Sequence, residues 1–347
     1  MKYSVVVPVY NRPGEVGELL ESLTRQTFAD FEVIIVEDGS TLTCRDVCRG
    51  YDGRLNISYL WKDNSGPGQS RNCGVAHAKG DYVLILDSDV VLPEGYLTAV
   101  DEELSREECD AFGGPDCAHP SFTDTQKAIS YSMTSFFTTG GIRGGSKKLD
   151  KFYPRSFNMG VRSDVYRRLG GFSNMRFGED IDFSIRIFRA GLRCRLFPGA
   201  WVWHKRRTDL RKFFRQVFNS GIARINLYKR YPSSLKAVHL LPAVFTVGVT
   251  LLVLVSAFGR AMMHYDAAHW HDWYRVAALP WIPIILYCVL IFVDATLKNK
   301  SAKIGLKSVA AAFTQLGGYG TGFIYAWWRR CVMGKDEFHV FGDTFYK

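Results

Sequence analysis

Two aspartates with one small residue between them, Asp87 and Asp89, follow directly after the short apolar run Tyr82–Leu86. A buried apolar run of this length, rich in β-forming residues, is typical of a central strand in a parallel sheet. Open α/β sheets bind their ligands at the carboxyl ends of such strands. Paired carboxylates are poor core residues there and good ligands for a hard cation. We therefore predict a cation site at this strand end, the alternative being two solvated acids.

Three further groups of polar residues stand where predicted strands end or predicted helices begin. Asp38 follows the second apolar run, Arg71 lies one turn into a predicted helix, and Glu179-Asp180 begins another. A helix start with a nearby cation suits a phosphate or an acidic base edge, and a carboxylate near an attacking hydroxyl can accept its proton. Each group also has a structural explanation: an Asx turn at Asp38, a surface salt bridge at Arg71 and helix-dipole contacts at Glu179-Asp180.

The elements that must position these residues alternate between strand and helix. Apolar runs at residues 3–8, 31–36, 56–61 and 82–86 are separated by stretches with helical signals. In the first of these, Val16, Leu19, Leu20 and Leu23 recur at helical spacing, which gives a helix with one apolar stripe. This β-α-β rhythm predicts an α/β fold with a mostly parallel, doubly wound sheet.

Charge and cysteine content narrow the classes of partner and compartment. The chain has 347 residues, a formal net charge of +10 and eight cysteines, none of them in a C-x-x-C pair. The positive charge favours an anionic partner, such as nucleic acid, a nucleotide phosphate or an anionic membrane surface. Scattered cysteines suit a reducing compartment. The run after Met1 resembles a strand rather than a secretory signal, so we expect the N-terminal part in the cytosol.

The second half of the chain has the pattern of a membrane protein. Residues 205–230 alternate basic and aromatic side chains, as in interfacial helices on an anionic leaflet, although an ordinary solvated face is the alternative. Residues 238–258 and 276–297 are long and apolar enough to span hydrocarbon. The lysines that follow the second run place that end in the cytosol by the positive-inside rule. Residues 304–328 fit either a third span or a surface-lying or re-entrant helix.

The chain contains five short motifs in the order SVVVPVYN (4–11), VEDGS (36–40), GPGQSRN (66–72), LDSD (86–89) and GED (178–180). These motifs and their order resemble those of family 2 glycosyltransferases of GT-A fold, and the resemblance covers residues 2–207. The membrane tail is similar to that of bacterial members that build exopolysaccharide or lipid-linked oligosaccharide. The resemblance implies a GT-A fold with C-terminal transmembrane helices and a nucleotide-sugar donor.

The resemblance also implies roles on the donor side of the site. Asp89 resembles the metal ligand of the DxD pair, with Asp87 toward the ribose, and the metal would be Mn²⁺ or Mg²⁺. His204 occupies the place of a further metal ligand, and a structural histidine is the alternative. The nucleotide would be bound by Asp38, which suits uracil or thymine, and by Arg71, Pro8 and Tyr10.

On the acceptor side, Asp180 resembles the catalytic base of an inverting transferase. Glu179 and Asn158 would orient the acceptor or contact the donor sugar. Asp182 stands four residues before Arg186, so we expect it to form a helical ion pair instead.

These observations predict an inverting glycosyltransferase that moves a sugar from a UDP-linked donor to a hydroxyl of a lipid-linked saccharide. It would act at the cytosolic face of the inner membrane as a multi-pass protein in contact with membrane lipids. The alternatives are a polyprenyl-phosphate glycosyltransferase and a non-catalytic nucleotide-sugar-binding subunit. We expect no nucleic-acid partner, because the basic residues gather beside apolar spans rather than on a recognition motif. The predicted domains are a GT-A domain (1–207), interfacial helices (208–236), a membrane region (237–330) and a tail (331–347).

Overall fold

The computed structural model describes residues 1–119, 121–139, 152–175 and 177–337. The described residues form two compact units, one comprising residues 1–119, 152–175, 177–205 and 337, the other residues 121–139 and 206–336. Residues 121–139 thus group with the C-terminal helices, although the sequence placed them in the first domain. The predicted tail lies outside the described residues from position 338 onward.

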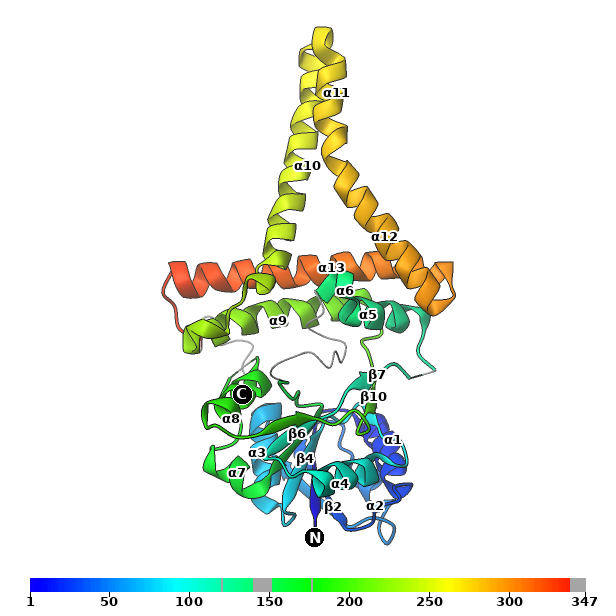
Figure 1. Cartoon of the computed structure of the whole chain (residues 1–347), viewed down its shortest axis with the longest axis vertical. Helices are drawn as coiled ribbons and strands as arrows, with labels where there is room; N and C mark the ends of the chain where they lie inside the picture. Colours follow the sequence, from blue (N-terminus) through cyan, green and yellow to red (C-terminus); the bar gives the residue numbers. More distant parts are fainter. Residues whose placement is uncertain (120, 140–151, 176, 338–347) are drawn as a thin grey trace. The chain divides into compact units, whose positions relative to one another are not determined.

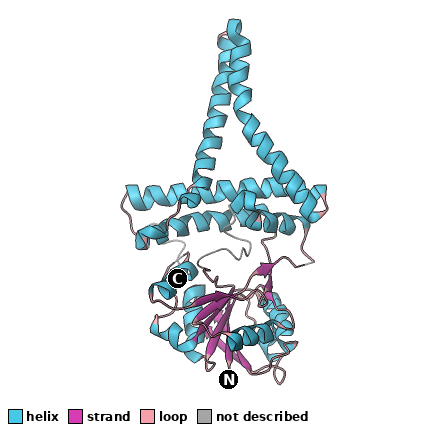
Figure 2. Cartoon of the chain, viewed as in Figure 1, coloured by secondary structure: helices cyan, strands magenta, loops and turns pink. Residues whose placement is uncertain are grey.

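All the strands in the described part of the chain belong to the first unit, as Figure 2 shows. They are β1 (Tyr3–Val9), β2 (Phe31–Asp38), β3 (Ile57–Lys62), β4 (Tyr82–Leu86), β5 (Val90–Val91), β6 (Ala111–Gly113), β7 (Asp116–Cys117), β8 (Asn158–Arg162), β9 (Cys194–Leu196) and β10 (Val202–His204). The helices of this unit are α1 (Pro13–Thr24), α2 (Arg45–Arg49), α3 (Pro67–His77), α4 (Tyr96–Arg106), α7 (Ser163–Arg168) and α8 (Glu179–Arg189).

The larger sheet confirms the predicted mostly parallel α/β architecture. Its seven strands lie in the order β3-β2-β1-β4-β8-β6-β9. The strands β1 to β4 are parallel to one another, and β8 is antiparallel to both of its neighbours. Alternate side chains of β1 enter separate apolar clusters, Val5 and Val7 on one face and Val6 on the other. Because β2 and β4 are parallel, Asp38 and Asp87 emerge at the same edge of the sheet.

A smaller sheet brings a distant part of the chain beside the end of β4. Its three strands lie in the order β5-β10-β7. The antiparallel pairing of β10 with β5 sets His204 opposite Val90. The parallel pairing of β10 with β7 sets Val202 opposite Asp116. His204 is thereby held next to Asp89, the residue that precedes β5.

The second unit is entirely helical in its described part. Its α-helices are α5 (Asp124–Thr134), α6 (Phe136–Thr139), α9 (Leu210–Arg230), α10 (Leu241–Tyr265), α11 (Trp270–Ala278), α12 (Ile282–Asn299) and α13 (Ala302–Trp327). Short 3₁₀ turns η1 (Pro232–Ser234), η2 (Ala237–His239), η3 (Ala267–His269) and η4 (Leu279–Trp281) connect some of them, and α13 ends in the π-turn η5 (Trp328–Val332). The helix α5, which was not predicted, begins with a capping box formed by Thr123 and Gln126.

Two stretches of this unit are long and apolar enough to cross a membrane, Ala237–Tyr265 and Trp270–Asn299. They contain the predicted spans 238–258 and 276–297. The helix α13 covers the third apolar run up to Trp327 and is 26 residues long, but it is not among the stretches apolar enough to cross a membrane.

Instead, α13 packs along α9 within the second unit (Figure 1). The backbones approach closely at glycines: a Cβ on Gly322 would lie 2.1 Å from the carbonyl oxygen of Phe218, and one on Gly221 would lie 2.6 Å from the amide nitrogen of Phe323. Gly318 similarly faces Phe214. Since both residue numbers rise together along the contact, the two helices run in the same direction. Small residues at such a seam are typical of closely packed helices.

Candidate active site

Three side chains from the two sheets form a cluster that can hold a metal ion. Asp87, Asp89 and His204 each offer one ligand atom, and these atoms all lie within 4.8 Å of one another. Asp89 is only 6% exposed, with Oδ1 3.2 Å from Nε2 of His204 and Oδ2 2.5 Å from a guanidinium nitrogen of Arg12. Burial raises the pKa of Asp89, but His204 and Arg12 outweigh it and hold the pKa well below its usual range. Asp89 is therefore ionised.

The groups around His204 fix the position of its ring and shift its pKa. Its ring stacks on Phe157, with centroids 4.8 Å apart, and its Nδ1 lies 3.7 Å from Asp116. Burial lowers the pKa of His204, but Asp116 and Asp89 together raise it to about 9. Two carboxylates and an imidazole fit a divalent cation and suit Mn²⁺ better than Mg²⁺. A cation bound here would use the unprotonated ring nitrogen.

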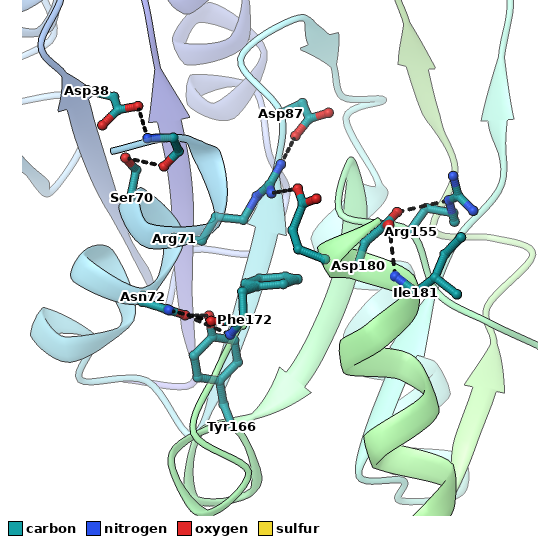
Figure 3. Close-up of polar contacts among 12 residues, drawn as sticks. Asp38, Ser70, Arg71, Asn72, Asp87, Arg155, Tyr166, Phe172, Asp180 and Ile181 are labelled. Atoms are coloured by element: carbon teal, nitrogen blue, oxygen red, sulfur yellow. Dashed lines mark hydrogen bonds and ion pairs between the residues drawn. The ribbon is translucent and has the colours of Figure 1, made fainter. Parts of the chain in front are cut away.

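Arg71 lies between the metal cluster and the start of α8. The left-handed glycine Gly66 (φ 90°) opens α3 and places Arg71 one turn into that helix. Its guanidinium lies 2.7 Å from Asp87 (Figure 3). It also lies 3.2 Å from Glu179. Arg71 is only 3% exposed, so it is not the surface salt bridge that was the structural alternative. The predicted contact between Arg71 and a nucleotide stays a prediction.

The two acids at the start of α8 differ in their environment. Asp180 is buried and accepts a hydrogen bond from the backbone of Ile181 at 2.8 Å. Its other oxygen lies 3.0 Å from Nε of Arg155 (Figure 3). Burial raises the pKa of Glu179, although Arg71 opposes the shift. As predicted, Asp182 instead pairs with Arg186 at 3.0 Å.

Asp38 accepts hydrogen bonds from the loop that leads into α3. One carboxylate oxygen accepts from Lys62 at 2.6 Å and from the backbone of Ser65 at 2.9 Å, and the other accepts from the backbone of Gly66 at 2.9 Å. These are the contacts of a turn-forming aspartate. A carboxylate has about four acceptor positions, and three are used here. One position is left for a ligand donor, so the predicted contact with a base stays compatible with the geometry.

The remaining predicted residues have very different surroundings. Tyr10 is 51% exposed at the end of β1, and Pro8 is half-buried within that strand. Asn158 is only 1% exposed. Its amide accepts from the hydroxyl of Tyr96 at 2.7 Å and donates to the carbonyl of Ala200 at 2.8 Å. Because both ends of the amide contact protein, Asn158 is better placed to fix the strand than to bind a sugar or acceptor.

Several residues of the site were not predicted. Arg12 follows a strand end in sequence, a signal that could have drawn attention to it. Asp116 lies on a two-residue strand that leaves no periodic signal, and Arg155 precedes β8 in a stretch without a recognised motif. Glu37 is fully buried and accepts from the thiol of Cys44 and the hydroxyl of Tyr59. It therefore supports the turn after β2 from inside.

Comparison with known proteins agrees with this geometry. Residues 4–170 match the family model described as Glycosyl transferase family 2. Together with the GT-A-type sheet and the aspartate pair after β4, this match shows that the chain carries a family 2 glycosyltransferase domain.

Individual relatives align over part of the chain. A glycosyltransferase, GlyG, of Streptococcus pneumoniae is 32% identical over 114 residues, which cover 32% of this chain and 38% of that protein. The poly(ribitol-phosphate) beta-N-acetylglucosaminyltransferase TarS of Staphylococcus aureus is 42% identical over 93 residues, 26% of this chain and 16% of that protein. The aligned stretches thus span well under half of these relatives.

A solved structure is similar over more of the chain. The mannosyltransferase PcManGT from Pyrobaculum calidifontis, in complex with GDP-Man and Mn²⁺, superposes with a TM-score of 0.57 at 16% identity. The match covers 95% of this chain and 88% of that one. At this identity the likeness concerns the fold.

Proposed function

We propose that this chain is an inverting, metal-dependent glycosyltransferase. It transfers a sugar from a nucleotide-sugar donor, UDP-linked by our proposal, to a hydroxyl of a lipid-linked saccharide. One arrangement at the edge of the larger sheet carries the proposal. Asp87, Asp89 and His204 form a cluster there, and Arg71 links Asp87 to Glu179 at the start of α8. Cation ligands suit the diphosphate leaving group, and a separate carboxylate suits the attacking hydroxyl.

The residues divide the chemistry between them. Asp87, Asp89 and His204 would hold a divalent cation, which would supply charge neutralisation for the diphosphate leaving group. Asp180 accepts the proton of the acceptor hydroxyl as its oxygen attacks the anomeric carbon opposite that leaving group. The contacts of Asp180 with Ile181 and Arg155 hold its carboxylate in one orientation. Attack from the opposite side inverts the configuration of the anomeric carbon.

The choice of uridine rests on Asp38. The imide N–H of uracil is a donor that a carboxylate can accept, and Asp38 retains one acceptor position beyond its contacts with the protein. The PcManGT complex contains GDP-Man, so a guanosine donor is the competing outcome of a donor screen.

The second unit supports a membrane location. Ala237–Tyr265 and Trp270–Asn299 anchor the chain in our proposal, and α13 lies at the membrane surface beside α9. Lys298, Lys300, Lys303 and Lys307 follow the second stretch, which by the positive-inside rule puts this end and the first unit at the cytosolic face. An acceptor on a lipid carrier would be kept at the same surface.

A donor screen tests the proposal. Membranes that contain the full chain are incubated with UDP- and GDP-linked sugars, lipid extract, and Mn²⁺, Mg²⁺ or a chelator, and release of nucleotide is measured. We expect release from a UDP-sugar, supported by Mn²⁺ and abolished by the chelator. Release only from GDP-sugars would overturn the donor assignment, and no release from any donor would overturn the enzymatic function.

A further inference from the structure

Arg71 contacts an acid on the donor side of the candidate site and another on the acceptor side. One guanidinium nitrogen lies 2.7 Å from Oδ1 of Asp87, at the end of β4. Another lies 3.2 Å from Oε1 of Glu179, at the start of α8. Asp87 belongs to the cation cluster, and Glu179 adjoins the proposed base Asp180. Arg71 therefore connects groups that the proposed reaction uses for different substrates.

The surroundings leave Arg71 little freedom to reorient. The guanidinium carbon stands 5.3 Å from the ring centre of Phe172. The neighbouring Asn72 locks the same segment to α3, because its amide donates to the carbonyl of Phe172 and accepts from the backbone of Phe172, both at 2.8 Å. The hydroxyl of Tyr166 adds a third bond to Asn72 at 2.7 Å (Figure 3). The guanidinium is thus held in place while its two acidic partners face the site.

One positive charge here serves two carboxylates. In a buried environment the attraction between such charges is strong, so each acid limits how tightly Arg71 binds the other. When Glu179 is charged, its negative charge offsets part of the positive potential that Arg71 creates at Asp87, and a cation binds at Asp87 more favourably. When Glu179 is neutral, the guanidinium interacts with Asp87 alone and competes more effectively with a cation for it.

We propose that Arg71 is a positioning residue that couples the donor site to the acceptor site through Asp87 and Glu179. The charge state and contacts of Glu179 then set the affinity of Asp87 for the cation and the donor diphosphate. By reciprocity, donor binding changes the affinity of Glu179 for the acceptor. This inference rests on the proposed function, since it takes Asp87 as a donor-side group and Glu179 as an acceptor-side group.

A double-mutant cycle tests the coupling without any turnover. The affinity of the purified full chain in detergent for Mn²⁺, and for UDP in the presence of Mn²⁺, is measured by calorimetry in the absence of acceptor. We expect Glu179→Gln to weaken binding by about fivefold or more, the lower end of typical coupling between sites. In the Arg71→Lys background the same substitution should change binding by less than about twofold, because one ammonium group cannot reach both carboxylates as a planar fork does.

The controls separate coupling from loss of structure. Asp164→Asn removes another carboxylate paired with an arginine, Arg162, at an exposed position of α7, and should leave both affinities unchanged. Thermal melting of each variant shows that it is folded, and Arg71→Met provides a second background. An equal effect of Glu179→Gln in both backgrounds, or no effect in either, would overturn the coupling while leaving the proposed function intact. If the unchanged chain binds neither Mn²⁺ nor UDP with Mn²⁺, the proposed function fails together with the coupling.

Discussion

Nε2 of His204 lies 3.2 Å from Oδ1 of Asp89, although a large part of the first unit separates the two residues in sequence. The contact exists because β10 pairs with β5, which begins directly after Asp89. The DxD pair is therefore completed by the last strand of the unit. A perturbation of β10 should consequently affect the cation site as much as a change in the aspartates themselves.

Replacement of Asp89 tests the cation site most directly. Asp89→Asn keeps the size of the side chain but removes the charge that His204 and Arg12 face, so we expect Mn²⁺ affinity to fall by at least about tenfold. The affinity is measured by Mn²⁺ titration, followed by electron paramagnetic resonance. Asp46→Asn, at an exposed position of α2, is the matched control. Unchanged affinity in Asp89→Asn would show that the cation binds elsewhere.

Asp180→Asn should separate chemistry from binding. Loss of a general base typically lowers turnover by about 10²–10⁴-fold, while the affinity for donor nucleotide should stay within about twofold of the unchanged chain. Steady-state turnover and nucleotide calorimetry on the same preparation give both quantities. Retained turnover would mean that the acceptor needs no base, as expected for a phosphate acceptor on a polyprenyl carrier.

The raised pKa of His204 predicts a pH-dependent contribution to stability. Its folded-state pKa is about 9, against about 6.5 in an unfolded chain. A raised pKa stabilises the folded state fully below about pH 6.5, and the contribution disappears as pH rises through 9. It amounts to at most about 3 kcal/mol.

The measurement for this prediction is the melting temperature of the chain in detergent with chelator present, compared with His204→Gln. The wild-type chain should have the higher melting temperature at pH 6, and the difference in melting temperature from His204→Gln should shrink toward pH 9.5. A difference that grows with pH would contradict the ion pairs assigned to His204.

The seam between α9 and α13 can be tested with two glycines of the same helix. A Cβ on Gly322 would lie 2.1 Å from the carbonyl oxygen of Phe218, whereas nothing lies within 4 Å of a Cβ on Gly317. Overpacking of this kind costs about 1–3 kcal/mol, so Gly322→Ala should lower the melting temperature. Gly317→Ala should be neutral or stabilise by up to about 1 kcal/mol, because alanine favours helix. Equal effects of the two substitutions would contradict the close packing of α13 against α9 at Gly322.

Local signals in the sequence were sufficient for the first part of the fold. The strand Tyr82–Leu86 has the predicted bounds, because an unbroken apolar run ends there in two acids. The parallel sheet and the two long apolar stretches also follow from periodicity and hydropathy. These features depend on residues close together in the chain.

Pairings between distant segments could not be predicted in the same way. The contacts of Arg12 with Asp89 and of Arg71 on α3 with Glu179 on α8 join residues that are far apart in the sequence. Asn158 was expected to contact the acceptor or sugar. Its amide bonds to Tyr96 on α4 and to Ala200 between β9 and β10, two partners far away in the sequence that no local pattern indicates. The site roles of all the predicted residues remain predictions, namely those of Pro8, Tyr10, Asp38, Arg71, Asp87, Asp89, Asn158, Glu179, Asp180 and His204.

The parallel course of α9 and α13 makes the apolar hairpin a crossover connection. The chain leaves α9 at its C-terminal end and must return to its N-terminal end before α13 begins. That return covers the length of a 21-residue helix, about 31 Å. A shortened, hairpin-free chain would therefore need a linker of at least about nine extended residues to keep the two helices paired. Fusing Arg230 directly to Ala302 would force the helices apart, however well the rest of the protein folds.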